Sequence, residues 1–206
     1  FVSLYRSIYQ FALVIEIGLI HRSIKSVKIS VESRFDILVN NAGMAPTGFV
    51  ETEDGHESTW HANHLGPVLL TELLLPLIEK SDEGRIVMVS SGLHKLVMYA
   101  RELARRLKER GSQITVNSLH PGSIKTKLGR NFGFHVIVIQ TVGQFFMKSC
   151  KEGAQTTLYL ALSTEVNGES GEYYADCKHA AESANAMDDE ACKKLYDYSL
   201  RTVGLT

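Results

Sequence analysis

The chain has 206 residues, of which 44% are hydrophobic and 22% charged, and its 22 Lys+Arg against 23 Asp+Glu give a net charge of -1. This length suits one domain with a real core, and the composition excludes collagenous, coiled-coil and disordered proteins. The balanced charge gives no basic field for nucleic acid. Cys150, Cys177 and Cys192 form no CxxC pair, so we expect a reducing compartment and neither a disulfide scaffold nor a zinc site.

The longest apolar segments are too short to cross a membrane. Residues 11–20 carry Glu16, and residues 132–146 carry His135 and two glutamines, so both fall short of the roughly 20 apolar residues that a spanning helix needs. The sequence begins at Phe1 without a basic region or a cleavage site, and we do not predict a signal peptide. We expect a location that is cytoplasmic or peripheral to an intracellular membrane.

Along the chain, short apolar runs alternate with longer amphipathic segments. Residues 35–40 form a buried strand, and leucines at helical spacing predict a helix over 60–80. A second buried strand covers 84–91. A strong helix follows over 96–110 and ends at Gly111.

The second half continues the same alternation. We predict a strand at 114–119, a helix over 152–163, a short strand at 171–174 and a last helix over 188–200, capped by Asp188 or its neighbour. Strands that are continuously apolar are typical of a parallel sheet covered on both faces. The sequence therefore predicts a single α/β domain over 1–206.

The ends of the three main strands carry small, polar or turn-forming residues. These ends are residues 40–43, 90–92 and 120–122. Ligands of open parallel sheets bind outside the carboxyl ends of the strands. Gly43 and Gly122 let the backbone approach a ligand closely. The pattern alone thus predicts a small-molecule or nucleotide site at this edge.

Four motifs in this order resemble those of the short-chain dehydrogenase/reductase family. They are Asn40-Asn41-Ala42-Gly43, Asn63-His64-Leu65-Gly66-Pro67, Val89-Ser90-Ser91 and His120-Pro121-Gly122-Ser123-Ile124-Lys125-Thr126. Flanking text such as YARELARRL and SGEYYADC resembles the retinol dehydrogenase-like branch. The resemblance covers about residues 33–205. It implies a Rossmann-type doubly wound parallel sheet, incomplete here, with helices on both faces.

The resemblance also implies a site. The catalytic residues that match are Asn63, which holds a water in the proton relay, and Ser91, which orients the carbonyl. The cofactor-binding positions that match are Asn40, Asn41, Ala42, Gly43, Pro121, Gly122, Ile124 and Thr126. The implied cofactor is NADP or NAD, and the implied substrate is a small lipophilic alcohol or carbonyl, retinol-like or retinal-like. Residues 132–146 stand where the family has its substrate-covering element; an exposed apolar patch there would instead indicate contact with a membrane surface or an oligomer partner.

Two family features have no counterpart in the sequence. No TGxxxGxG loop is found, and residues 13–30 match nothing in the family and read as an unrelated insertion. We therefore expect weak dinucleotide binding, because that loop brings the pyrophosphate to a helix N-terminus. The strand ending at Asn40 is expected to have an unpaired edge unless residues 13–20 supply a replacement strand. The family's Tyr-xxx-Lys segment is missing where Lys95 runs directly into Leu96.

Two tyrosines were considered as substitutes for the missing proton donor. Tyr99 follows Lys95 by four residues, which reverses the family order, and it is expected to be a core aromatic of its helix. Tyr174 and Lys178 match the spacing but lie in the last predicted strand. Two kinds of function stay open: an oxidoreductase of this family, and a non-catalytic chain, such as a pseudoenzyme, splice product or gene-model fragment, that acts at most by pairing with related subunits.

Other singled-out residues have structural alternatives. His61 and His64, with no third ligand, are expected to pack and not to bind a metal. The alternative role of Asn63 is that of a buried structural amide. The alternative role of Thr126 is that of a helix N-cap. The basic residues of one predicted helix are expected to form a solvated face, with an acidic-lipid or phosphate patch as the alternative; they are Arg101, Arg105, Arg106, Lys108 and Arg110.

Overall fold

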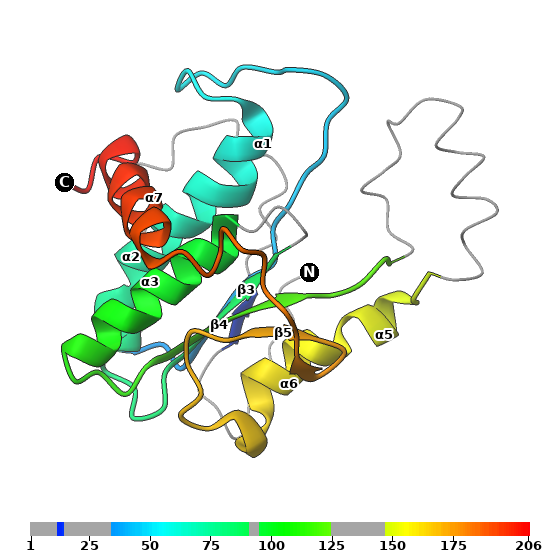
Figure 1. Ribbon diagram of the computed structural model, residues 1–206, viewed down its shortest axis with the longest axis vertical. Coiled ribbons are helices and arrows are strands. Elements are labelled where there is room, and N and C mark those ends of the chain that lie inside the picture. Colours follow the sequence, from blue (N-terminus) through cyan, green and yellow to red (C-terminus); the bar gives the residue numbers. More distant parts are fainter. Residues whose placement is uncertain (1–11, 15–33, 91–94, 125–146) are drawn as a thin grey trace.

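The computed structural model describes residues 12–14, 34–90, 95–124 and 147–206, drawn in colour in Figure 1. Its strands form one six-stranded sheet in the order β1-β2-β3-β4-β5-β6. The strands are β1 (Ala12–Val14), β2 (Ile37–Asn40), β3 (Arg85–Val89), β4 (Thr115–His120), β5 (Tyr173–Ala175) and β6 (Lys178–His179). The first five are mutually parallel, and β6 alone runs antiparallel to its neighbour.

Most of the helices connect consecutive strands. They are α1 (Ser58–Trp60), the π-helical turn η2 (His61–Leu65), α2 (Gly66–Ile78), α3 (Lys95–Glu109), α5 (Cys150–Gly153), α6 (Gln155–Leu162), the 3₁₀ turn η5 (Thr164–Val166) and α7 (Asp189–Thr202). None of these described helices combines the length and the apolar character that crossing a bilayer requires.

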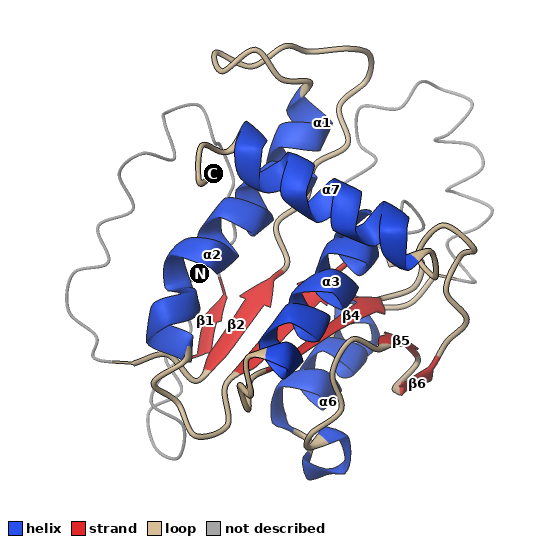
Figure 2. Cartoon of the chain, turned by 60° about the vertical axis from the view of Figure 1, so that its left-hand side comes forward, coloured by secondary structure: helices blue, strands red, loops and turns tan. Residues whose placement is uncertain are grey.

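The sheet is covered on both faces, as the continuous apolar strands predict. Figure 2 shows α2, α3 and α7 on one side of the strands and α6 on the other. Successive strand residues point to opposite faces: Leu38 joins the core under α2 and α3, whereas Ile37 and Val39 join the core under α6. The expected α/β doubly wound architecture is confirmed.

The edge of β2 is paired. β1 runs parallel to β2, with Ala12 opposite Ile37 and Val14 opposite Val39. The unpaired edge expected for the strand ending at Asn40 is therefore not found, because part of the 13–20 segment supplies a short replacement strand. The remainder of the 13–30 segment lies outside the described residues.

Two local features differ from the predicted elements. The helix expected over 152–163 is divided at Ala154 into α5 and α6. The strand β6 was not predicted. It is joined to β5 by the two-residue turn of Asp176 and Cys177, whose φ angles of 52° and 57° are both left-handed, as in the tight turns that fit the twist of a hairpin.

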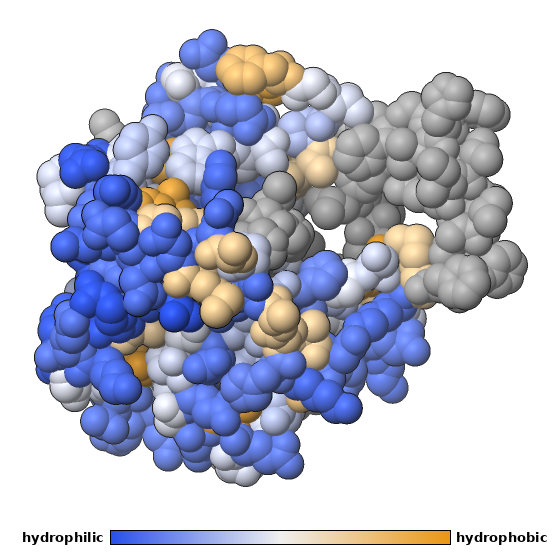
Figure 3. Space-filling view, in the orientation of Figure 1, coloured by the Kyte–Doolittle hydropathy of each residue, from blue (hydrophilic) through white to orange (hydrophobic). Residues whose placement is uncertain are grey.

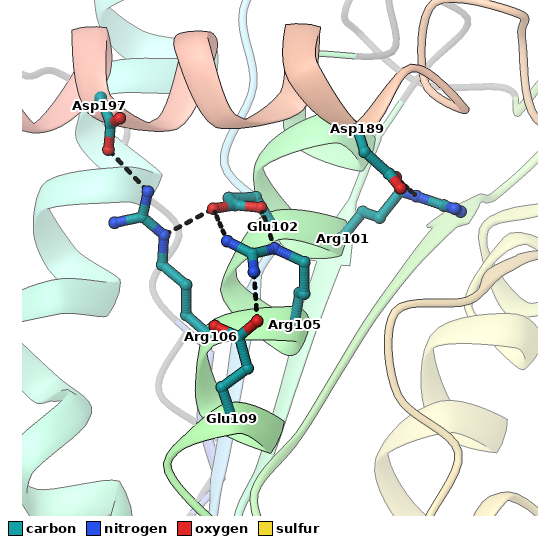
Figure 4. A network of polar contacts seen from close by, with 7 residues as sticks. All are labelled: Arg101, Glu102, Arg105, Arg106, Glu109, Asp189 and Asp197. Carbon is teal, nitrogen blue, oxygen red and sulfur yellow. Dashed lines mark hydrogen bonds and ion pairs between the residues drawn. The ribbon is translucent and has the colours of Figure 1, made fainter.

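Ion pairs attach α7 to α3 (Figure 4). Glu102 is buried at 1% exposure and accepts hydrogen bonds from Arg105 and Arg106. Burial raises the pKa of Glu102, but the hydrogen bonds from the two arginines outweigh it and hold that pKa below its ordinary value. Arg106 also donates to Asp197 of α7 at 2.7 Å, and Arg101 donates to Asp189. Arg101 and Arg106 thus join α3 to α7, whereas Arg105, Lys108 and Arg110 are exposed, as expected for a solvated face.

Candidate active site at the carboxyl edge of the sheet

The motifs meet at one edge of the sheet. Asn40, Ser90 and His120 stand at the carboxyl ends of β2, β3 and β4, which are consecutive strands. The loop of residues 41–57 rises from this edge to α1 (Figure 1). The loop exposes apolar side chains, with Phe49 at 76% exposure, and an apolar patch lies at the top of the molecule over it (Figure 3).

Asn63 is held in the π-helical turn η2, where it clamps this loop. The turn is marked by the N–H of Gly66, which donates to the carbonyl of His61 five residues earlier. The Asn63 Oδ1 accepts from the Met44 N–H at 2.8 Å, and its Nδ2 donates to the Met44 carbonyl at 2.8 Å. One side chain therefore satisfies both backbone groups of Met44. Single π-turns within helices are frequent at functional sites.

The backbone carbonyl of Asn63 lacks its usual helical donor. In an α-helix this oxygen would accept from the residue four positions later. That residue is Pro67, which has no N–H. The sequence Asn63-His64-Leu65-Gly66-Pro67 thus leaves a carbonyl oxygen without its i+4 partner next to the carboxyl edge.

Asn40 points into the protein. Its side chain is buried, and its Nδ2 donates to Thr71 Oγ1 of α2 at 2.9 Å and to Met88 Sδ of β3 at 3.1 Å. These bonds tie the end of β2 to its neighbours. Asn41 and Gly43 are exposed on the following loop. The assignment of residues 40–43 to cofactor binding stays a prediction.

Gly122 and Lys148 lie together beyond β4. Gly122 has φ of 85°, and a Cβ placed on it would lie 3.0 Å from the Lys148 Nζ. The Lys148 N–H donates to the Ser123 carbonyl at 2.8 Å, and its ammonium pairs with Asp176 of the hairpin turn. That hydrogen bond and charge hold the pKa of Asp176 below its ordinary value. Lys148 and Asp176 were missed by the sequence analysis, because nothing local signals a contact across 28 residues.

The structure describes some of the other predicted site residues that follow β4 and leaves others undescribed. Pro121 is half-buried, and Ile124 packs against Gly153 of α5, where a side chain on Gly153 would collide with it. Ser91, Thr126 and residues 132–146 lie outside the described residues. Their proposed roles stay predictions.

The hydroxyl of Tyr99 forms a hydrogen bond inside the core. Tyr99 is fully buried at 0% exposure and donates to Glu72 Oε1 at 2.8 Å, as does Tyr196, whose ring stacks on it. Burial and the neighbouring Glu72 carboxylate raise the pKa of Tyr99 well above its ordinary value. Tyr99 is therefore a core aromatic of α3, as expected.

Tyr174 is also buried in the sheet. It lies in β5, and its hydroxyl contacts Glu169 and the Nε2 of His179. Burial, followed by the hydrogen bond to Glu169, raises the pKa of Tyr174. A phenol with a raised pKa between a carboxylate and an imidazole is poorly suited to deliver a proton at neutral pH.

The two histidines of the helix are packing residues. His61 is 6% exposed and His64 is 2% exposed. His61 Nδ1 lies 3.1 Å from Thr52 Oγ1, and His64 Nε2 lies 2.8 Å from Ser199 Oγ of α7. Within the described ranges no group of three or more His, Cys, Asp and Glu is placed to hold a metal ion.

Comparisons with known proteins find similar sequences. Residues 19–133 match the family model described as short chain dehydrogenase. Human "Retinol dehydrogenase 14" is 41% identical over 204 residues, which cover 84% of this chain and 60% of that protein. "Short-chain dehydrogenase TIC 32 B, chloroplastic" of Brassica napus is 35% identical, with 88% of this chain and 69% of that protein covered. The chain thus spans 60% of the length of the retinol dehydrogenase 14 that it matches.

Solved structures share the fold. A protein of Mycobacterium paratuberculosis superposes with a TM-score of 0.63 at 24% identity, covering 84% of this chain and 68% of that one. A short chain dehydrogenase from Mycobacterium paratuberculosis bound to NAD superposes with a TM-score of 0.52 at 23% identity, covering 68% of this chain and 62% of that one. At these identities the likeness concerns the fold alone.

Proposed function

We propose that this chain, which belongs to the short-chain dehydrogenase/reductase family and to its retinol dehydrogenase-like branch, carries the nicotinamide and carbonyl end of an oxidoreductase site at the carboxyl edge of its sheet. The proposed substrate is a small lipophilic alcohol or carbonyl, retinol-like or retinal-like. The observation that supports the proposal is the double hydrogen bond between Asn63 and Met44, which attaches the loop after β2 to the residue that matches the family's catalytic asparagine.

The described residues fit a nicotinamide cofactor, NADP or NAD. Gly122 adopts a left-handed conformation, and a side chain there would fill the space beside the Lys148 ammonium. To contact a phosphate group, that ammonium would have to share its charge with Asp176, its ion-pair partner, and exposed Gly43 lets the backbone of the loop approach a ligand. When bound, the cofactor supplies the hydride. Residues 40–43 and 121–124 would hold it.

Asn63 and Ser91 would act on the substrate side. The amide of Asn63 fixes the loop through Met44. The backbone carbonyl of Asn63, which Pro67 cannot bond, would hold a water. Ser91 follows β3 in sequence and would donate to the carbonyl oxygen. Hydrogen-bond donors that are already in position polarise a carbonyl without any free-energy cost of reorganisation during the reaction.

A second candidate function is a non-catalytic chain that pairs with related subunits. It is favoured by the placement of the two phenols that the sequence offered as proton donors. Tyr99 and Tyr174 are both buried, and their hydroxyls contact Glu72 and Glu169. A chain of this kind would orient its ligands but have no general acid. The family segment that carries the Tyr-xxx-Lys pair has no counterpart between the adjacent residues Lys95 and Leu96.

Substitution of Gly122 tests the placement of the cofactor. Gly122→Ala is expected to weaken NADPH binding at least several-fold, because the new Cβ displaces Lys148 and strains a left-handed backbone. Gly111→Ala is the matched control: Gly111 is also left-handed, with φ of 72°, but no atom of the described residues lies within 4 Å of its Cβ position. Binding is followed by titration of NADPH fluorescence. Equal affinities in the two variants would contradict the proposed site.

A further inference from the structure

The π-helical turn η2 and its flanking residue Trp60 are joined to three other parts of the molecule. Asn63 bonds the backbone of Met44 in the loop after β2. Next to it, His64 contacts Ser199 of α7, 135 residues away in sequence. Trp60 stacks on His64 with ring centroids 4.1 Å apart, and the Lys95 ammonium at the start of α3 lies 4.3 Å from the Trp60 ring. The turn is therefore held from several sides.

The hydrogen bond between His64 and Ser199 has a defined direction. The Ser199 hydroxyl donates to the Leu195 carbonyl at 2.7 Å. Having used its one proton there, Ser199 Oγ accepts from His64 Nε2–H at 2.8 Å. The neutral imidazole is thereby held as the Nε2–H tautomer. Among the described residues its buried Nδ1 has no hydrogen-bond partner, so within this part of the chain Ser199 supplies the hydrogen bond of the ring.

Asn63 and His64 together set the rotation of the turn. Adjacent residues of a helical turn point in different directions around its axis, so the bond to Met44 and the bond to Ser199 act on different faces. A turn held on one face alone can rotate about that contact. Rotation back to an α-helical register would move the Asn63 amide away from Met44.

We propose that Ser199 is a positioning residue for Asn63: through His64, the C-terminal helix holds η2 in the register that lets Asn63 clamp the loop at the carboxyl edge. The inference rests on the proposed function only in that this function gives Asn63 a catalytic role. The positioning itself concerns contacts within this chain.

Other contacts keep α7 in place when Ser199 is changed. Arg106 of α3 donates to Asp197 and lies over the ring of Tyr196 at 4.1 Å. Tyr196 in turn donates to Glu72 of α2 at 2.8 Å. Loss of the Ser199 hydroxyl is therefore expected to loosen the turn while α7 stays docked.

Hydrogen exchange at the Met44 amide tests the proposal, because this N–H donates to Asn63 Oδ1. Ser199→Ala is expected to speed exchange of this amide about tenfold, the effect of losing roughly one hydrogen bond that holds the turn. Thr202→Ala is the matched control: Thr202 makes the same bond to the carbonyl four residues earlier, at 2.8 Å, but is only half-buried, whereas Ser199 is fully buried. Asp197→Asn controls for weaker docking of α7.

The outcomes separate clearly. The proposal expects faster exchange at Met44 in Ser199→Ala than in both controls after correction for global stability, and near wild-type exchange in Ser199→Thr, which keeps the hydroxyl. It also expects a changed emission of Trp60, the single tryptophan of the chain, because Trp60 stacks on His64. Equal exchange in Ser199→Ala and Asp197→Asn would overturn it. No cofactor is used, so this result is independent of the Gly122 experiment.

Discussion

The 206-residue chain is expected to give no measurable reduction of retinal with NADPH or NADH. In the proposed site Asn63 and Ser91 would still orient and polarise a carbonyl, but the developing alkoxide needs a proton donor. The described tyrosines considered for this role, Tyr99 and Tyr174, are buried in the core and bonded to Glu72 and Glu169. Loss of a general acid typically lowers the rate by about 10²–10⁴-fold.

The assay follows retinol formation by chromatography, with a retinol dehydrogenase that has the Tyr-xxx-Lys pair as the positive control. If the chain does turn over, Tyr99→Phe and Tyr174→Phe identify the donor, and Ser91→Ala tests the carbonyl contact. Turnover abolished by Tyr99→Phe would show that this phenol reaches the substrate, contrary to its placement against α2 and α7. Turnover that survives all three substitutions would refute the assigned active site.

Mild acid is expected to destabilise the fold through His64. Burial, assisted by the charge of Lys95, lowers the pKa of His64 from 6.5 to about 3. The unfolded chain therefore takes up a proton as the pH falls below 6.5, while the folded chain takes it up only near 3. The stability linked to His64 is complete above the unfolded-state pKa. It declines in acid by up to about 1.4 kcal/mol per pH unit, the slope for one proton.

Urea unfolding at a series of pH values measures this decline. His64→Gln is expected to be less stable at neutral pH, yet to lose the part of the acid slope that this imidazole contributes. His179→Gln is the control, because the side chain of His179 is 57% exposed. An unchanged slope in His64→Gln would show that His64 is not buried in its neutral form.

The sequence predicted the main elements because their signals are local. Apolar runs identified β2, β3 and β4, and Asp188 caps α7 by accepting from the Ala191 N–H at 3.0 Å. The short strands depended on partners: β1 exists through its pairing with β2, and β6 through a turn in which two residues other than glycine adopt positive φ. The sequence offered a strand within residues 13–20 only as an alternative, and it gave no indication of β6, because so few residues show no periodicity.

The candidate site was predictable in its position and not in its contacts. The strand ends at residues 40–43, 90–92 and 120–122 were expected at the carboxyl edge, and the resemblance singled out Asn63, but its partner Met44 is 19 residues away. The inward bonds of Asn40 depend on Thr71 and Met88, which other elements supply. Ser199 is farther still from His64 in sequence. Such contacts follow from the packing of the whole sheet and its helices.

The central claim is that a nicotinamide cofactor binds at the carboxyl edge. Amide chemical-shift mapping with millimolar NADPH tests it most directly, since weak binding suffices. We predict shifts at Asn41, Gly43 and Gly122. At the opposite edge, a cavity of about 260 Å³ is lined by residues that include Asp36 and Arg85. Shifts confined to that cavity, with none at the two glycines, would contradict the account.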